Sequence, residues 1–175
     1  MSVEEKNKDL MKTLDDAWNS QDWDTFEERH AENVAVFWPG QLNPTRGVRN
    51  HRAESIEFFK AFPDNHIVNN PYKILFVNGD YTCSVAGFTG TFKRPMKGLD
   101  GQIIQPTNRK FQIEFCTVAK WKDGKITEER LFYDLIGVND SDWGNALKIT
   151  EMRGKCSLSK KILTRYIVGR CIASF

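Results

Sequence analysis

The sequence lacks the usual cysteine patterns of disulfide and zinc sites. Its four cysteines are widely spaced, form no Cys-x-x-Cys pair and have no histidine nearby in a ligand spacing: Cys83, Cys116, Cys156 and Cys171. Reduced thiols are therefore expected rather than disulfides or bound zinc. Of the three histidines, His30 stands at a predicted helix end and His51 near a predicted helix start. We expect both to cap a helix or to contact water.

Long apolar runs, internal repeats and low-complexity tracts are also absent. No apolar run approaches the roughly 20 residues that a membrane-spanning helix needs. The first ten residues, MSVEEKNKDL, are polar and acidic, unlike a signal peptide. We expect a cytoplasmic protein, and 175 residues with 40% hydrophobic content suit one domain with an adequate core.

The chain has no excess of positive charge outside the C-terminal segment. The net charge is +2, but residues 145–175 carry seven Lys or Arg against Glu151 alone, so this segment is +6 and the remainder −4. An acidic body argues against a nucleic-acid-binding core, because phosphate contacts need a basic surface. Residues 145–175 are predicted to be a loosely ordered basic extension. The alternative is a basic amphipathic helix suited to an anionic membrane or a partner groove.

Helices are predicted early in the chain and strands late. Apolar residues at helical spacing predict a first helix, a shorter one follows Asp22 as its N-cap, and a third spans about 49–62 before Pro63. Strands are predicted at 34–38, 72–77 and 81–92, followed by a long loop over 93–105. This order predicts one α+β domain over 1–144, in which a curved, mainly antiparallel sheet wraps the helices and leaves a pocket.

Residues 110–136 are predicted to form a long β-hairpin around an Asp123-Gly124 turn. Regular pairing outward from the turn sets Trp121 opposite Ile126, Phe115 opposite Phe132 and Ile113 opposite Asp134. Asp134 would then lie on an apolar face, where low polarity raises a carboxyl pKa toward the range useful for proton transfer. A β-bulge would reverse this assignment of faces.

Several short motifs occur in a familiar order. They are Trp23-Asp24, residues 54–59, Asn78-Gly79-Asp80, Gly90-Thr91, Pro106-Thr107, and residues 123–126 with Glu128 and Asp134. Over about residues 10–138 the chain resembles the SnoaL-like polyketide (ester) cyclases of the nuclear transport factor 2-like superfamily, which have a cone-shaped, cystatin-like α+β fold. The resemblance implies a cone-shaped apolar pocket and aldol closure of a polyketide ester, with Asp134 as the general acid/base. It implies no metal or organic cofactor.

A second catalytic group is harder to identify from the sequence. Many relatives carry a histidine after the Gly-Thr pair, whereas this chain has Phe92. The candidates for this group are Arg130, Glu128, Tyr72, Tyr133 and His66. His66, at a predicted strand start, could reach the mouth of the cone, although a histidine in a turn is more often exposed. Candidates for contact with an apolar or aromatic substrate are Arg130, Glu128, Phe115, Phe132, Trp38, Phe92 and Trp121. Glu128 and Arg130 could instead form a solvated pair.

Two functional classes remain open from the sequence. The first is a cofactor-independent enzyme of the cyclase type, with ketosteroid-isomerase-like, dehydratase or epoxide-hydrolase chemistry as variants. The second is a non-catalytic module of the same fold that binds a small ligand or acts as a dimeric interaction domain. We also expect a homodimer, because the outer face of the hairpin would expose an apolar row comprising Cys116, Val118, Leu131 and Leu135.

Overall fold

Three helices form one side of the domain. The computed structural model describes residues 2–98 and 101–134, and its helices are α1 (Val3–Ser20), α2 (Trp23–Glu28) and α3 (Val48–Ala61). A capping box starts α1, since the Ser2 hydroxyl accepts from the Glu5 amide and the Glu5 carboxylate accepts from the Ser2 amide. Asp22 caps α2 as predicted. The third helix lies one residue earlier than predicted and ends before Pro63.

The strands form a seven-stranded sheet and a separate two-stranded hairpin. The hydrogen-bonded order of the large sheet is β2-β1-β9-β8-β5-β3, and β4 also pairs with β5. All pairings are antiparallel except that of β1 with β9. The strands are β1 (His30–Phe37), β2 (Thr45–Arg46), β3 (His66–Val68), β4 (Ile74–Asn78), β5 (Tyr81–Thr91), β6 (Met96–Lys97), β7 (Ile103–Ile104), β8 (Lys110–Lys122) and β9 (Lys125–Tyr133). The small β6–β7 hairpin lies within the predicted long loop.

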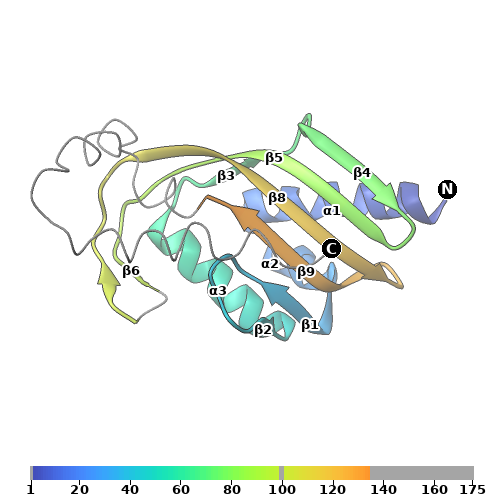
Figure 1. Ribbon diagram of the computed structural model, residues 1–175, viewed down its shortest axis with the longest axis horizontal. Helices are drawn as coiled ribbons and strands as arrows, with labels where there is room; N and C mark the ends of the chain where they lie inside the picture. Colours follow the sequence, from blue (N-terminus) through green and yellow to red (C-terminus); the bar gives the residue numbers. More distant parts are fainter. Residues whose placement is uncertain (1, 99–100, 135–175) are drawn as a thin grey trace, which may run out of the picture. The chain divides into compact units, whose positions relative to one another are not determined.

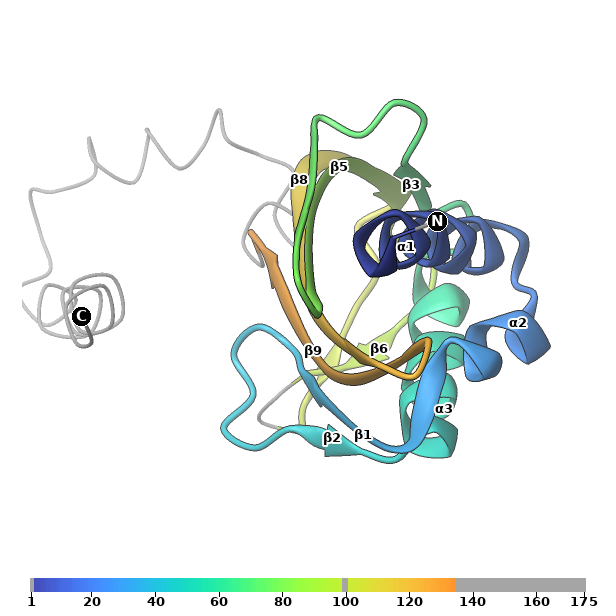
Figure 2. The ribbon, with the colours of Figure 1, turned by 90° about the vertical axis from the view of Figure 1, so that its right-hand side faces the viewer.

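The large sheet curves around the helices (Figures 1 and 2). Strands β5, β8, β9 and β1 form the curved wall, and α1 and α3 lie on its concave side. Aromatic side chains fill much of the space between the two layers, and several of them pack edge to face or stacked. The predicted α+β architecture with a curved, mainly antiparallel sheet is confirmed.

The β8–β9 hairpin has the predicted turn but not the predicted register. Asp123 and Gly124 both have positive φ, as a two-residue hairpin turn requires, and Trp121 pairs with Ile126. The next pair, however, is Lys120 with Glu128, which leaves Thr127 as an extra residue in β9. This β-bulge shifts every later residue of β9 to the opposite face. The predicted pairs Phe115–Phe132 and Ile113–Asp134 are therefore wrong, and Phe115 pairs with Tyr133.

Two further predictions concern the C-terminal segment and the outer row of the hairpin. The proposed basic extension and the boundary near residue 144 lie outside the described residues, and so does Leu135 of the predicted outer row. Leu131, from the same row, is buried rather than exposed, because the bulge turns it inward. No helix in the part of the chain that the structure describes has both the length and the apolar character needed to cross a membrane.

Candidate functional site

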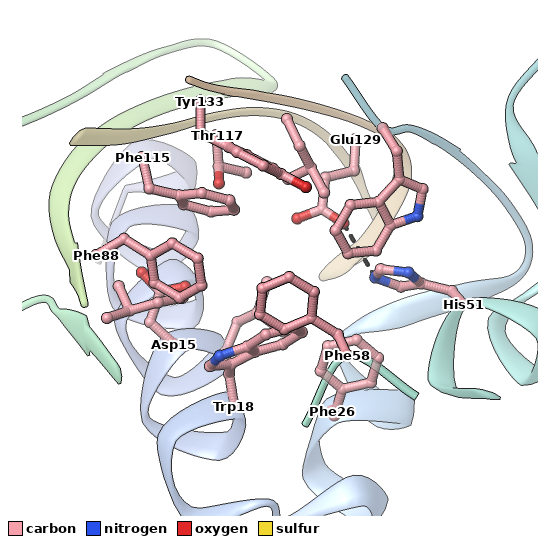
Figure 3. A pocket seen from close by; sticks show the side chains of 14 residues that line it. Asp15, Trp18, Phe26, His51, Phe58, Phe88, Phe115, Thr117, Glu129 and Tyr133 are labelled. Atoms are coloured by element: carbon pink, nitrogen blue, oxygen red, sulfur yellow. Dashed lines mark ion pairs between the residues drawn. The ribbon is translucent and has the colours of Figure 1, made fainter. Parts of the chain in front are cut away.

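A narrow pocket lies between the helices and the concave face of the sheet (Figure 3). The cavity is small, with a volume of about 30 Å³. Most of the wall is aromatic or aliphatic, with polar groups at two places. The lining residues are Leu14, Asp15, Trp18, Phe26, Trp38, His51, Phe58, Ile67, Phe88, Phe115, Thr117, Glu129, Leu131 and Tyr133.

The first polar group of the wall is centred on Glu129 of β9. Its Oε2 atom lies 3.5 Å from Nε2 of His30 and 3.3 Å from Nε2 of His51. All three side chains are almost fully buried. The bulge turns Glu129 inward, β1 lies beside β9 and brings His30 close, and α3 supplies His51 from the helical layer. Figure 3 shows the Glu129 carboxylate directed into the pocket beside His51.

The protonation of this cluster is partly fixed by the backbone. Nδ1 of His30 lies 2.7 Å from the carbonyl oxygen of Phe26. A carbonyl oxygen can only accept, so Nδ1 carries a hydrogen and Nε2 is the nitrogen that faces Glu129. Burial alone would raise the pKa of Glu129, but the two imidazoles outweigh it and lower that pKa to about 2. Burial lowers the pKa of His51, even though Glu129 opposes that effect.

The second polar group is Asp15 on α1. Its Oδ2 accepts a 2.6 Å hydrogen bond from the Tyr72 hydroxyl. Burial raises the pKa of Asp15 to about 7, and the hydrogen bond from Tyr72 only partly offsets this. Figure 3 shows Asp15 and Glu129 on opposite sides of the pocket. Tyr133 adds a hydroxyl whose pKa is raised to about 12 by burial, so that it remains a donor at neutral pH.

The structure brings only two of the sequence-predicted site residues into the pocket, Phe115 and Trp38. Phe92 and Trp121 are buried elsewhere in the core: Phe92 stacks on Phe62, and the Trp121 indole donates to the Thr82 hydroxyl. His66 is exposed on β3. These three side chains do not line the cavity for which they were predicted.

The remaining predicted residues lie on the wrong face of the hairpin because of the bulge. Phe132 is 53% exposed. Arg130 is exposed, packs its guanidinium over the Phe37 ring and pairs with Glu128 at 2.8 Å. Asp134 is also exposed, lies one residue beyond the end of β9 and is not among the residues that line the pocket. The prediction that Asp134 faces an apolar cavity is therefore wrong.

The sequence reading missed Asp15, Glu129, His30 and His51. For Asp15 a signal was present: Met11, Asp15 and Trp18 are spaced i, i+4, i+7, so a carboxylate interrupts the apolar face of the first helix. His30 and His51 were expected to cap helices or contact water, and instead both are buried. The sequence spacing does not indicate that His30, His51 and Glu129 are neighbours, because they lie on three separate elements that meet only in the folded domain.

Comparison with known proteins places the chain in a family. The model of the family described as SnoaL-like polyketide cyclase matches residues 8–140. No curated protein sequence matches significantly. Among solved structures, a provisionally assigned SnoaL-like polyketide cyclase from Jannaschia sp. CCS1 is 22% identical, with a TM-score of 0.69, over 80% of this chain and 96% of that one.

Two further structures have the same fold. IdmH from Streptomyces antibioticus, a provisionally assigned polyketide cyclase, is 20% identical with a TM-score of 0.62, over 75% of this chain and 94% of its own. A protein of ketosteroid isomerase-like fold from Catenulispora acidiphila DSM 44928 is 13% identical with a TM-score of 0.60, over 74% and 88% of the two chains. Because the family match extends over most of this chain, the chain belongs to the SnoaL-like polyketide cyclase family.

Proposed function

We propose that this protein is a small-molecule enzyme of the cyclase type that transfers protons to and from a carbonyl compound in the pocket, with Asp15 as the acid/base group. The observation that supports this is a carboxyl group on the wall of an apolar pocket whose pKa is raised to about 7. A general acid/base is most effective when its pKa lies near the operating pH. Family membership supports cyclase-type chemistry as the class of reaction.

The proposed reaction is an intramolecular aldol closure of a polyketide ester. Ionised Asp15 takes a proton from the carbon next to a carbonyl group, and that carbon forms a bond to a second carbonyl carbon of the same molecule. The resulting alkoxide oxygen then takes the proton back from Asp15. The Tyr72 hydroxyl holds the Asp15 carboxylate in place throughout. The Tyr133 hydroxyl is a donor for the enolate oxygen.

The pocket wall favours a flat, apolar substrate. Rings from both layers face the cavity, among them Trp18, Phe58, Phe88 and Phe115. Aromatic side chains make large contacts with planar ligands and prefer offset or edge-to-face packing. The cavity volume is only about 30 Å³, so a multi-ring substrate requires these side chains to move apart.

The test uses 5-nitrobenzisoxazole, an aromatic carbon acid that opens to a coloured phenolate when a base removes its ring proton. Asp15→Asn keeps the shape of the side chain but cannot take the proton, so turnover should fall about 10² to 10⁴-fold. The matched control is Asp16→Asn, since Asp16 is the exposed neighbour on the same helix. This control should stay within about twofold of the wild-type rate.

Binding of the same probe distinguishes the alternative function. Quenching of tryptophan fluorescence measures it directly, because Trp18 and Trp38 line the pocket. Binding together with Asp15-dependent turnover supports the enzyme. Saturable binding of the probe and of aromatic polyketide esters, with no turnover of either, would instead indicate a non-catalytic ligand-binding module.

A further inference from the structure

Three buried side chains place potential ligand atoms around one point. One potential ligand atom from each of His30, His51 and Glu129 lies within 4.8 Å of the other two. Nε2 of His30 and Nε2 of His51 are 3.5 and 3.3 Å from Oε2 of Glu129. Ligands about 2.1 Å from a shared ion lie roughly 3.0 to 3.4 Å apart at octahedral and tetrahedral angles. The two distances to Oε2 of Glu129 are therefore close to those between ligands that share one metal ion.

The hydrogen-bonding pattern of the cluster indicates that a cation lies between His30 and Glu129. Among the described residues, Nε2 of His30 and Oε2 of Glu129 have no hydrogen-bonding partner although both are fully buried. Nδ1 of His30 already donates to the Phe26 carbonyl, so a neutral His30 points the lone pair of Nε2 at the carboxylate. Two lone pairs facing each other in a buried site repel unless a cation lies between them. That cation is either a proton or a metal ion.

The surroundings resemble the outer shell of metal-binding histidines. A histidine ligand typically donates its second ring nitrogen to a carbonyl or carboxylate, which fixes the tautomer and the ring orientation. His30 makes this contact with Phe26, and the Phe26 ring also packs against both imidazoles. Nδ1 of His51 has no such partner among the described residues, so His30 alone shows this outer-shell contact.

We propose that His30, His51 and Glu129 bind one divalent first-row transition-metal ion, with its open coordination positions toward the pocket. Two imidazoles and one carboxylate suit zinc, iron, cobalt or manganese. His51 and Glu129 line the pocket, whereas His30 lies behind them, so any remaining ligand comes from the pocket side. A water molecule or a carbonyl oxygen of a pocket ligand has the right chemistry for that position. This proposal stands independently of the role of Asp15.

The test is titration of the full-length, chelator-treated protein with Co²⁺, followed by its visible absorption, and then competition with Zn²⁺. One ion per chain is expected, with dissociation in the micromolar range or tighter. His51→Ala and Glu129→Ala should each weaken binding at least about 100-fold, since loss of even an outer-shell partner costs 10- to 100-fold. The controls are His66→Ala and Glu128→Gln, which remove an exposed histidine and the outward-facing neighbour of Glu129. Both should bind as the wild type does.

A second measurement uses the wild-type protein, so that the test does not depend on whether the variants fold. X-ray absorption of the Zn²⁺-loaded chain should show two imidazoles with oxygen ligands and no sulfur. A sulfur shell would place the ion at cysteine and overturn the proposal. The absence of saturable binding would also overturn the proposal, and so would unchanged binding by a folded His51→Ala protein. Either result would leave a shared proton as the cation in the cluster.

Discussion

Glu128 and Glu129 are chemically identical neighbours in β9 whose environments have almost nothing in common. Glu128 faces outward, where its carboxylate accepts a hydrogen bond from exposed Arg130. Glu129 faces inward, is 5% exposed and lies beside two buried histidines. The difference arises from the bulge at Thr127, because adjacent strand residues point to opposite faces and one extra residue decides which is which.

The comparison teaches that the chemistry of the pocket depends on backbone register as much as on residue type. With regular pairing, Glu128, Arg130 and Phe132 would face the helices. With the bulge, the inward residues are Glu129, Leu131 and Tyr133. Either register presents one glutamate to the cavity, but regular pairing would add an arginine and a phenylalanine, whereas the bulged register adds a leucine and a tyrosine.

Exchanging the residues at 130 and 131, by Arg130→Leu together with Leu131→Arg, should have the largest effect, because Leu131 faces the core and Arg130 faces outward in the bulged register. The exchange combines burial of an unpaired charge with loss of core packing. We expect loss of the cooperative urea transition and of near-ultraviolet circular dichroism. Deleting Thr127 removes only the unpaired residue and leaves Glu128 opposite Lys120, so this variant should retain both signals. An exchange variant with wild-type stability would show that the two positions do not face opposite sides as the bulged register requires.

The strands of this hairpin were predictable from the sequence, but its register was not. The Asp123-Gly124 turn and the two apolar segments around it are local signals, and both are found in the structure. A bulge instead depends on how β9 meets β1 on one side and β8 on the other. The β1 residues involved lie about 90 positions earlier in the chain, and alternation along β9 alone cannot supply their contribution.

The candidate site was likewise only partly predictable from the sequence. Phe115 was correctly placed on the inner face, because it lies on the regular strand opposite the bulge. The buried histidines come from β1 and α3, and only tertiary packing brings them to Glu129. Helix and strand positions follow from local patterns, whereas a cluster assembled from three elements requires the fold itself.

The pair Glu129→Gln and Glu128→Gln measures the energetic difference between the two faces. Removing one member of a buried charged cluster typically costs about 3 to 5 kcal/mol, because the groups left behind lose their compensation. An exposed ion pair contributes about 0 to 1 kcal/mol. Urea unfolding near neutral pH should therefore separate the variants by several kcal/mol. Equal losses would mean that the buried cluster adds no more stability than the surface pair.

Asp15 offers a comparison on the opposite wall, where burial raises a carboxyl pKa instead of lowering it. Its folded pKa of about 7 exceeds the ordinary 3.8, so between these pH values the folded protein binds more protons than the unfolded chain. Stability attributable to Asp15 is therefore present below about pH 4 and is lost as the pH rises to 7.

Asp15→Asn should remove this part of the pH dependence. Relative to wild type, the variant should gain roughly 1.4 kcal/mol per unit of pKa shift between pH 4 and 8. The groups facing Asp15 are Tyr72, Glu129 and Asp16, and all three remain in the variant. Unfolding free energies at several pH values provide the measurement, with Asp9→Asn, at an exposed position of the same helix, as control. Parallel curves for wild type and Asp15→Asn would contradict the raised pKa.

The outer face of the sheet is the proposed homodimer interface, although its apolar row differs from the one predicted. Ile74, Val85, Cys116 and Phe132 are lateral neighbours across β4, β5, β8 and β9. Ile74 and Phe132 are each about half exposed, at 51% and 53%. An exposed apolar row of this kind suits a self-complementary contact.

Phe132→Lys should shift the protein from dimer to monomer in sedimentation at micromolar concentration, because it places a charge within that contact. At concentrations where wild type and variant are both monomeric, the unfolding free energy per chain should change little, since Phe132 is not part of the hydrophobic core. Thr127→Ala, on the same strand but outside the row, serves as the matched control. Wild-type protein that is monomeric under these conditions would end the proposal.

Asp134→Asn should have the smallest effect of all. The residue follows the last position of β9, is exposed and does not line the pocket, so replacing its carboxylate leaves the cavity unchanged. Surface substitutions usually alter stability by less than about 0.5 kcal/mol. Turnover of 5-nitrobenzisoxazole should stay within about twofold of wild type, in contrast to Asp15→Asn. If Asp134→Asn instead lost 10²-fold or more in rate while remaining folded, the acid/base group would be at the strand end after all, and the bulge would not exclude this carboxylate from the chemistry.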